Sequence, residues 1–162
     1  MLVIYDHDSN IILAHALKTI QAAEITAAWK KLYDTITQHD HTTTYWIIDN
    51  EASAYLKNAL AKNDQQLQLT PPHMHRINAA ERAIRTYKNH LLAGLATCDE
   101  NFPINEWDRL IPAANITINL LRNSIIKTKL SSYAAIFGNF NFNSTPLCPP
   151  GTKAIIHYKP NK

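Results

Sequence analysis

Short β-forming runs alternate with amphipathic helical stretches along this chain, and this alternation constrains the fold more than any other feature. Leu2 to Tyr5 is a β-rich run, and residues 11–14 form another. Residues 6–10 between them, Asp-His-Asp-Ser-Asn, are turn formers, so the segment predicts a β-hairpin. Beyond it, apolar side chains recur at three- and four-residue spacing from about residue 19 to 38, which predicts a helix.

Further elements follow in a similar order. The sequence predicts a strand over 44–48, a helix over 52–61, a strand over 67–69, helices from about residue 78, over 104–123 and over 131–137, and a final strand over 154–158. Pro112 is expected to kink the helix over 104–123. This order predicts an α/β fold in which helices cover a central sheet.

Length and composition narrow the class of protein. A chain of 162 residues is long enough for one domain with a real core. No apolar run approaches the roughly 18–20 residues of a membrane span, and Met1 leads into an apolar run without the basic residues of a secretory signal. Cys98 and Cys148 lack C-x-x-C spacing, which predicts free thiols in a reducing compartment. We therefore expect no membrane partner and no disulfide framework.

Charge is distributed unevenly along the chain. Residues 1–70 carry five Lys and Arg against eight Asp and Glu, a balance of −3, whereas residues 71–162 carry eleven against five, a balance of +6. An acidic half beside a basic half fits a metal-binding rim next to a phosphate-binding surface. A chance asymmetry of a solvated surface is the alternative.

Asp49 directly follows the apolar run Tyr45 to Ile48, which the sequence predicts to be a buried strand. Functional groups often lie at the C-terminal ends of sheet strands, where side chains face a crevice. An ordinary turn aspartate that caps the next helix would occupy the same position. Spacing alone leaves both interpretations of Asp49 open.

Glu81 follows Asp49 by 32 positions (81 − 49) and falls in the first turn of a predicted helix. A carboxylate there is favoured by the helix dipole, and with Asn78 as N-cap it completes a box-like capping signature. Capping therefore explains Glu81 without catalysis. The basic residues around it favour a metal and phosphate site instead; these are Arg76, Arg82, Arg85 and Lys88.

Two segments resemble the catalytic core of retroviral and copia-type retrotransposon integrases. Asp49-Asn50-Glu51 is similar to the family's D-N-G-like motif, with Glu51 where the family more often has glycine. The run from Asn78 to Arg82 is similar to its N-G-x-x-E-R-like motif. The stretches 107–122, 130–133 and 149–152 look like the later helices and the exit segment, so the resemblance covers nearly the whole chain.

The resemblance implies a ribonuclease H-like fold, an α/β mixed sheet flanked by helices. Residues 1–145 would form an integrase catalytic core-like domain, and residues 146–162 an exit segment and the start of a following C-terminal module. The implied function is DNA integration by divalent-metal-dependent phosphodiester strand transfer. The implied partner is DNA, the active form is expected to be a homo-oligomer, and the implied location is the nucleus or the cytoplasm.

Residue roles also follow from the resemblance. Asp49 and Glu81 would be the catalytic residues and would bind the metal, Mg²⁺ or Mn²⁺. The residues implied in DNA binding are Arg76, Asn78, Arg82, Arg85 and Lys88. Such contacts to phosphates give salt-sensitive binding that depends little on sequence.

The family's first metal-binding aspartate has no clear counterpart in this sequence. The run from Leu2 to Ser9 looks like the family's second strand and its turn, so we expect the first strand to be absent. Asp6 and Asp8 are then turn residues, for which a hairpin gives a sufficient local reason. The alternative makes Asp6 or Asp8 the first ligand, about forty residues before Asp49 (49 − 8 = 41).

Three functions remain open from the sequence. The first is an integrase-type polynucleotidyl transferase. The second is a catalytically inactive remnant that retains nucleic-acid binding. The third is a module of the same fold that binds only protein. Whether the chain is an enzyme is left undecided by the sequence.

Overall fold

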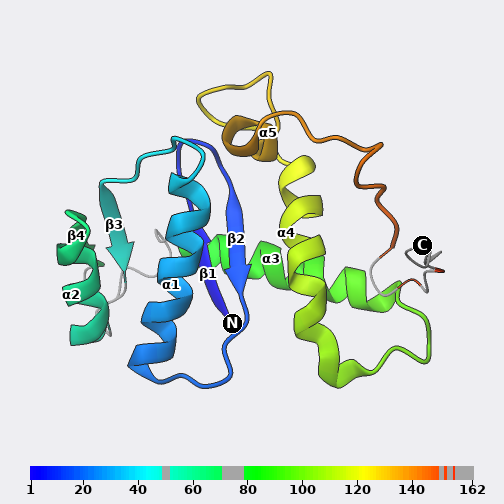
Figure 1. Cartoon of the computed structure of the whole chain (residues 1–162), viewed down its shortest axis with the longest axis horizontal. Coiled ribbons are helices and arrows are strands. Elements are labelled where there is room, and N and C mark those ends of the chain that lie inside the picture. Colours follow the sequence, from blue (N-terminus) through cyan, green and yellow to red (C-terminus); the bar gives the residue numbers. More distant parts are fainter. Residues whose placement is uncertain (49–51, 71–78, 150–151, 153–154, 156–162) are drawn as a thin grey trace, which may run out of the picture.

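Two small sheets packed among helices make up the protein in the computed structural model (Figure 1). The structure describes residues 1–48, 52–70, 79–149, 152 and 155. The strands are β1 (Leu2–Tyr5), β2 (Ile12–His15), β3 (Tyr45–Ile48) and β4 (Gln66–Leu69). The helices are α1 (Ala22–Thr37), α2 (Ala54–Lys62), α3 (Ala79–Ala96), the 3₁₀ helix η2 (Ile104–Leu110), α4 (Ile111–Leu120) and α5 (Ser132–Phe137).

Strands β1 and β2 form the predicted hairpin. They pair antiparallel with Leu2 opposite His15 and Tyr5 opposite Ile12. In the turn, the Asp6 carboxylate accepts a hydrogen bond from the Ser9 backbone N–H at 2.8 Å. Asn10 has a φ of 60°, a conformation that asparagine tolerates better than most residues. The turn residues therefore account for the hairpin, as the sequence predicts.

Strands β3 and β4 form a separate parallel pair joined through α2. Tyr45 lies opposite Gln66, and Ile48 lies opposite Leu69. The prediction of one central sheet is therefore wrong for the described part of the chain, where β1 and β3 do not pair. The prediction of a buried strand before Asp49 is also wrong, because the Tyr45 and Ile47 side chains are 51% and 47% exposed.

Helix α1 covers one face of both small sheets. Leu32 and Ile36 pack against the inner residues of the hairpin, such as Ile4. Trp29 packs against α2, and the side chains of Leu2 in β1 and Trp46 in β3 join the same cluster. Figure 1 shows α1 between the hairpin and the β3–β4 pair. The two sheets are thus held together by the apolar side of one helix, without backbone hydrogen bonds between their described strands.

The opposite face of the hairpin packs against α3 and α4. Side chains alternate along β2, so Ile12 and Ala14 meet this second layer while Ile11 and Leu13 face α1. Tyr87 of α3 is fully buried in the second layer. The hairpin is therefore apolar on both faces, as expected of strands between two helix layers.

Two asparagines of α4 bond to the outer edge of β2. Asn119 accepts a hydrogen bond from the Ile12 N–H at 2.9 Å and donates to the Ile12 carbonyl at 2.7 Å. Asn115 does the same for Ala14, at 3.0 Å in both directions. Residues four apart on a helix and residues two apart on a strand have similar spacing along their axes. The two side-chain amides therefore take the hydrogen-bonding positions that a neighbouring strand would occupy. This edge is closed to further pairing.

The register also determines the state of the outer edges of β1 and β3. Ile12 and Ala14 direct their backbone groups to α4, so their partners Tyr5 and Val3 direct theirs away from β2. In the parallel pair, Thr44 and Ile48 accept hydrogen bonds from the β4 side, so Tyr45 and Ile47 direct their backbone groups outward. Within the described chain, β1 and β3 therefore each have one open edge.

The later helices differ partly from the prediction. The prediction of a single kinked helix over 104–123 is wrong, because η2 ends at Leu110 and α4 begins at Ile111. Pro112 lies in the first turn of α4, where its missing N–H costs no helical hydrogen bond. Helix α5 agrees with the prediction, since Ser131 caps it and Gly138, with a φ of 78°, ends it. The predicted strand over 154–158 lies largely outside the described residues.

Candidate nucleic-acid interface

The first turn of α3 carries Glu81, which is the one of the two predicted catalytic carboxylates that the structure describes. Its side chain is exposed, and it lies in the acid-favouring first turn of an 18-residue helix. Ala83, Tyr87 and Leu91 anchor the opposite side of α3 in the core. The helix thus presents Glu81 to solvent from a rigid support.

Asp49 lies outside the residues that the structure describes, as do Arg76 and Asn78. The strand that leads to Asp49 is described and ends at Ile48, as the sequence predicts. The capping pair of Asn78 with Glu81 is likewise outside what the structure describes. The predicted joint site of Asp49 and Glu81 therefore stays a prediction.

Three predicted DNA-binding residues lie on the exposed part of α3. Arg82, Arg85 and Lys88 are all solvent-exposed, and no ion pair within the described chain neutralises them. Uncompensated cations on a rigid helix raise the local concentration of phosphate-bearing ligands. The positive charge of this surface is complementary to the negative charge of a nucleic-acid backbone.

Asp6 and Asp8 both lie in the hairpin turn. The Asp6 carboxylate bonds to Ser9 and lies 3.3 Å from Nε2 of His41. The backbone carbonyl of Asp8 accepts from the N–H groups of Ile125 and Ile126. These contacts give the Asp6 side chain a structural role in the turn, and they bind the Asp8 backbone to the segment after α4. Among the described residues, no three His, Cys, Asp or Glu side chains gather in a way that could hold a metal ion.

A small cavity lies between the hairpin, α3 and the segment after α4. It has a volume of about 210 Å³ and is lined by Tyr5, Ala79, Arg82, Ala83, Thr86 and Arg122. Arg122 is half-buried, and desolvation lowers the pKa of its guanidinium, an effect that Tyr5 partly opposes. Sequence reasoning missed Arg122, because no local pattern shows that a residue beyond α4 approaches the start of α3.

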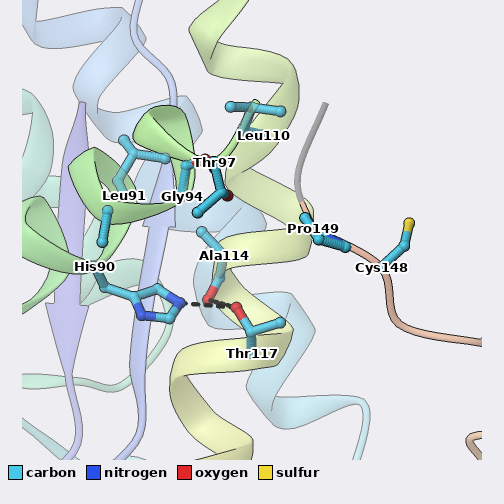
Figure 2. A pocket seen from close by; sticks show the side chains of 10 residues that line it. His90, Leu91, Gly94, Thr97, Leu110, Ala114, Thr117, Cys148 and Pro149 are labelled. Atoms are coloured by element: carbon cyan, nitrogen blue, oxygen red, sulfur yellow. Dashed lines mark hydrogen bonds between the residues drawn. The ribbon is translucent and has the colours of Figure 1, made fainter. Parts of the chain in front are cut away.

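A second, apolar pocket of about 320 Å³ lies between α3, α4 and the chain near Cys148 (Figure 2). His90 Nε2 lies 2.7 Å from the Thr117 hydroxyl at its wall. Burial lowers the pKa of His90. The predicted site residues that the structure describes do not line this pocket; these are Glu81, Arg82, Arg85 and Lys88.

Two further sequence predictions concern the cysteines and the membrane-spanning segments. Cys98 and Cys148 are free thiols, as predicted. Across the described helices, none is long and apolar enough to cross a membrane.

Comparison with known proteins identifies the fold. No family model matches the chain, and no curated protein matches it. Among solved structures, the chain is similar to the catalytic core domain of BIV integrase, with a TM-score of 0.60 and 17% sequence identity. The match covers 83% of this chain and 82% of that chain. The predicted ribonuclease H-like α/β fold is therefore confirmed, with small sheets in place of one continuous sheet.

Proposed function

We propose that this chain forms the core of a polynucleotidyl transferase that joins the DNA of a copia-type mobile element to target DNA. The observation that carries the proposal is the fold, which matches the catalytic core domain of an integrase along most of the chain. The exposed position of Glu81 beside uncompensated cations on α3 supports it. DNA is the proposed partner, and the acting form is proposed to be a homo-oligomer.

Asp49 and Glu81 are the proposed metal-binding residues. Their donor atoms are carboxylate oxygens, which suit Mg²⁺ or Mn²⁺ better than softer metals. When bound, such an ion stabilises the charge on the oxygens of an in-line phosphodiester displacement. Arg82, Arg85 and Lys88 would hold neighbouring DNA phosphates in place, and Arg76 and Asn78 are proposed to extend this contact.

Strand transfer by single-residue variants tests the assignment. Asp49→Asn and Glu81→Gln each remove one anionic metal ligand while nearly preserving shape, so each is expected to abolish Mg²⁺-dependent strand transfer and to leave DNA affinity within about twofold of wild type. Glu100→Gln is the matched control, since Glu100 is an exposed acid outside the proposed site. Transfer that survives in Asp49→Asn would remove Asp49 from the mechanism.

A second candidate is a catalytically inactive remnant that still binds nucleic acid. The observation behind it is that β1 and β3 each have an open edge in the described chain, where a further strand could join the two small sheets and carry a third carboxylate. Without that strand, two carboxylates hold the metal weakly. The remnant is then expected to bind DNA equally well in Mg²⁺ and in a chelator, and to show no strand transfer.

The gene sequence upstream of Met1 separates these two candidates. An in-frame, β-rich segment with an aspartate would supply the strand and support the active transferase. An experimentally mapped start of translation at Met1 would support the remnant. The assay with the longest natural form of the protein then decides whether strand transfer occurs.

A further inference from the structure

We propose that the cavity lined by Arg82, Thr86 and Arg122, here called the phosphate pocket, binds one phosphate group of a DNA backbone. The pocket takes its walls from three parts of the chain: β1, α3 and the segment after α4. Glu81, the predicted metal-binding residue that the structure describes, does not line it. In taking DNA as the ligand, this inference rests on the proposed function.

Two arginines line this one cavity from positions forty residues apart in sequence (122 − 82). Among the described residues, the lining contains no carboxylate. Neither arginine forms an ion pair with an acid in the described chain. Two like charges at one small cavity repel each other, so an anion between them relieves repulsion as well as forming its own contacts.

Arg122 is held in place before any ligand binds. Its Nε donates to the Asn10 carbonyl at 2.9 Å, and its Nη2 donates to the Asn10 side-chain oxygen. Both acceptors are neutral, so the charge of Arg122 is oriented without being cancelled. A preorganised guanidinium loses less conformational entropy on binding an oxyanion than a free surface arginine does.

The pocket supplies the donors that a phosphate requires. Two N–H groups of Arg122 bond to Asn10, and the others stay available for a ligand. Thr86 adds a hydroxyl, which can donate to a phosphate oxygen. The Tyr5 hydroxyl donates to Asn10 at 3.2 Å and so fixes the wall instead. The volume of about 210 Å³ accommodates one phosphate group.

Such a pocket would position DNA without reading its sequence, because phosphate contacts fix register and orientation only. Arg82 would link it to the exposed cations Arg85 and Lys88 further along α3. The DNA backbone would then run along α3, with one phosphate seated at the hairpin end of the helix. This gives the basic surface a defined anchor point.

The salt dependence of DNA binding tests the pocket. Fluorescence anisotropy with one labelled duplex is measured over a range of salt for wild type, Arg82→Gln, Arg122→Gln and the double variant. Each single variant is expected to weaken binding several-fold. The double variant is expected to reduce the magnitude of the negative slope of log K against log salt by about 1, which is the value for one lost phosphate contact. Because both arginines serve one phosphate, the effects of the two changes are expected to be less than additive.

Arg109→Gln is the matched control. Arg109 is an exposed arginine of η2 that pairs with Glu106 at 2.7 Å, and its loss is expected to leave the slope unchanged. Binding by Arg122→Gln that equals the control would overturn the pocket. A reduction of about 2 in the magnitude of the slope in the double variant would also overturn the proposed pocket, because the two arginines would then bind two separate phosphates.

A phosphate titration keeps the result independent of the proposed function. Inorganic phosphate is expected to raise the thermal midpoint of wild type and of Arg109→Gln, and not that of Arg82→Gln, an exposed change that spares the fold. If wild type does not bind DNA, the proposed function fails, and this titration alone decides between a pocket for free phosphate and no pocket. An equal rise in all variants would overturn the inference.

Discussion

Asn115 and Asn119 show how single residues decide the fate of a strand edge. Each amide bonds to both backbone groups of one β2 residue, Ala14 or Ile12. Asn119 is fully buried, so an alanine there would leave the Ile12 N–H and carbonyl without partners. Each buried group left unsatisfied costs about 1–3 kcal/mol. Asn119→Ala is therefore expected to lower the free energy of unfolding by about 2–4 kcal/mol in urea denaturation. Asn89→Ala, an exposed change on α3, is expected to stay within about 0.5 kcal/mol of wild type. Similar effects of the two changes would contradict the role of the Asn119 amide at the edge of β2.

His90 gives the stability a dependence on pH. Burial lowers its pKa from the ordinary value of 6.5, so below that value the unfolded chain binds more protons at this site than the folded chain. The stabilising contribution of neutral His90 is therefore present above pH 6.5 and is lost as the pH falls toward the lowered pKa. The free energy of unfolding is expected to decrease between pH 7.5 and pH 5.5, and less steeply in His90→Gln. Equal slopes for variant and wild type would rule out this contribution.

At the scale of elements, β3 combines an open edge with exposed apolar side chains. Tyr45 and Ile47 direct both backbone groups and side chains away from the core. Such edges promote association between molecules, and a lysine at the edge suppresses it. Ile47→Lys is therefore expected to reduce concentration-dependent self-association in sedimentation velocity while changing the free energy of unfolding little. Ile125→Lys is the control, because Ile125 is 54% exposed on a segment outside the strands. An equal effect of both changes would point to apolar exposure in general instead of the edge.

The whole molecule consists of two small sheets that share α1. The hairpin packs on both faces, whereas the β3–β4 pair and α2 are held mainly through the cluster around Trp29. We expect the β3–β4 unit to open at a lower free energy than the hairpin, with faster amide exchange in α2 and β3 than in β2. Trp29→Leu is expected to widen this difference, and Ile118→Val, a mild change in the other cluster, to leave it unchanged. Uniform exchange in both units after Trp29→Leu would show that the molecule unfolds as a single unit.

The sequence by itself determined the local elements of this protein. Hairpin, helices and caps follow from turn formers, periodic apolar residues and residues such as Ser131, because neighbours in the chain carry that information. The motif around Glu81 also led to the fold that the comparison identifies.

Only the tertiary structure decided which distant segments meet. It closes the β2 edge with Asn115 and Asn119, and it brings Arg122 to the same cavity as Arg82. In the described chain it also keeps β1 and β3 in separate sheets. No local pattern predicts these contacts, because they depend on how the helices pack over the hairpin. The joint position of Asp49 and Glu81 is of the same kind, and strand transfer by their variants is its test.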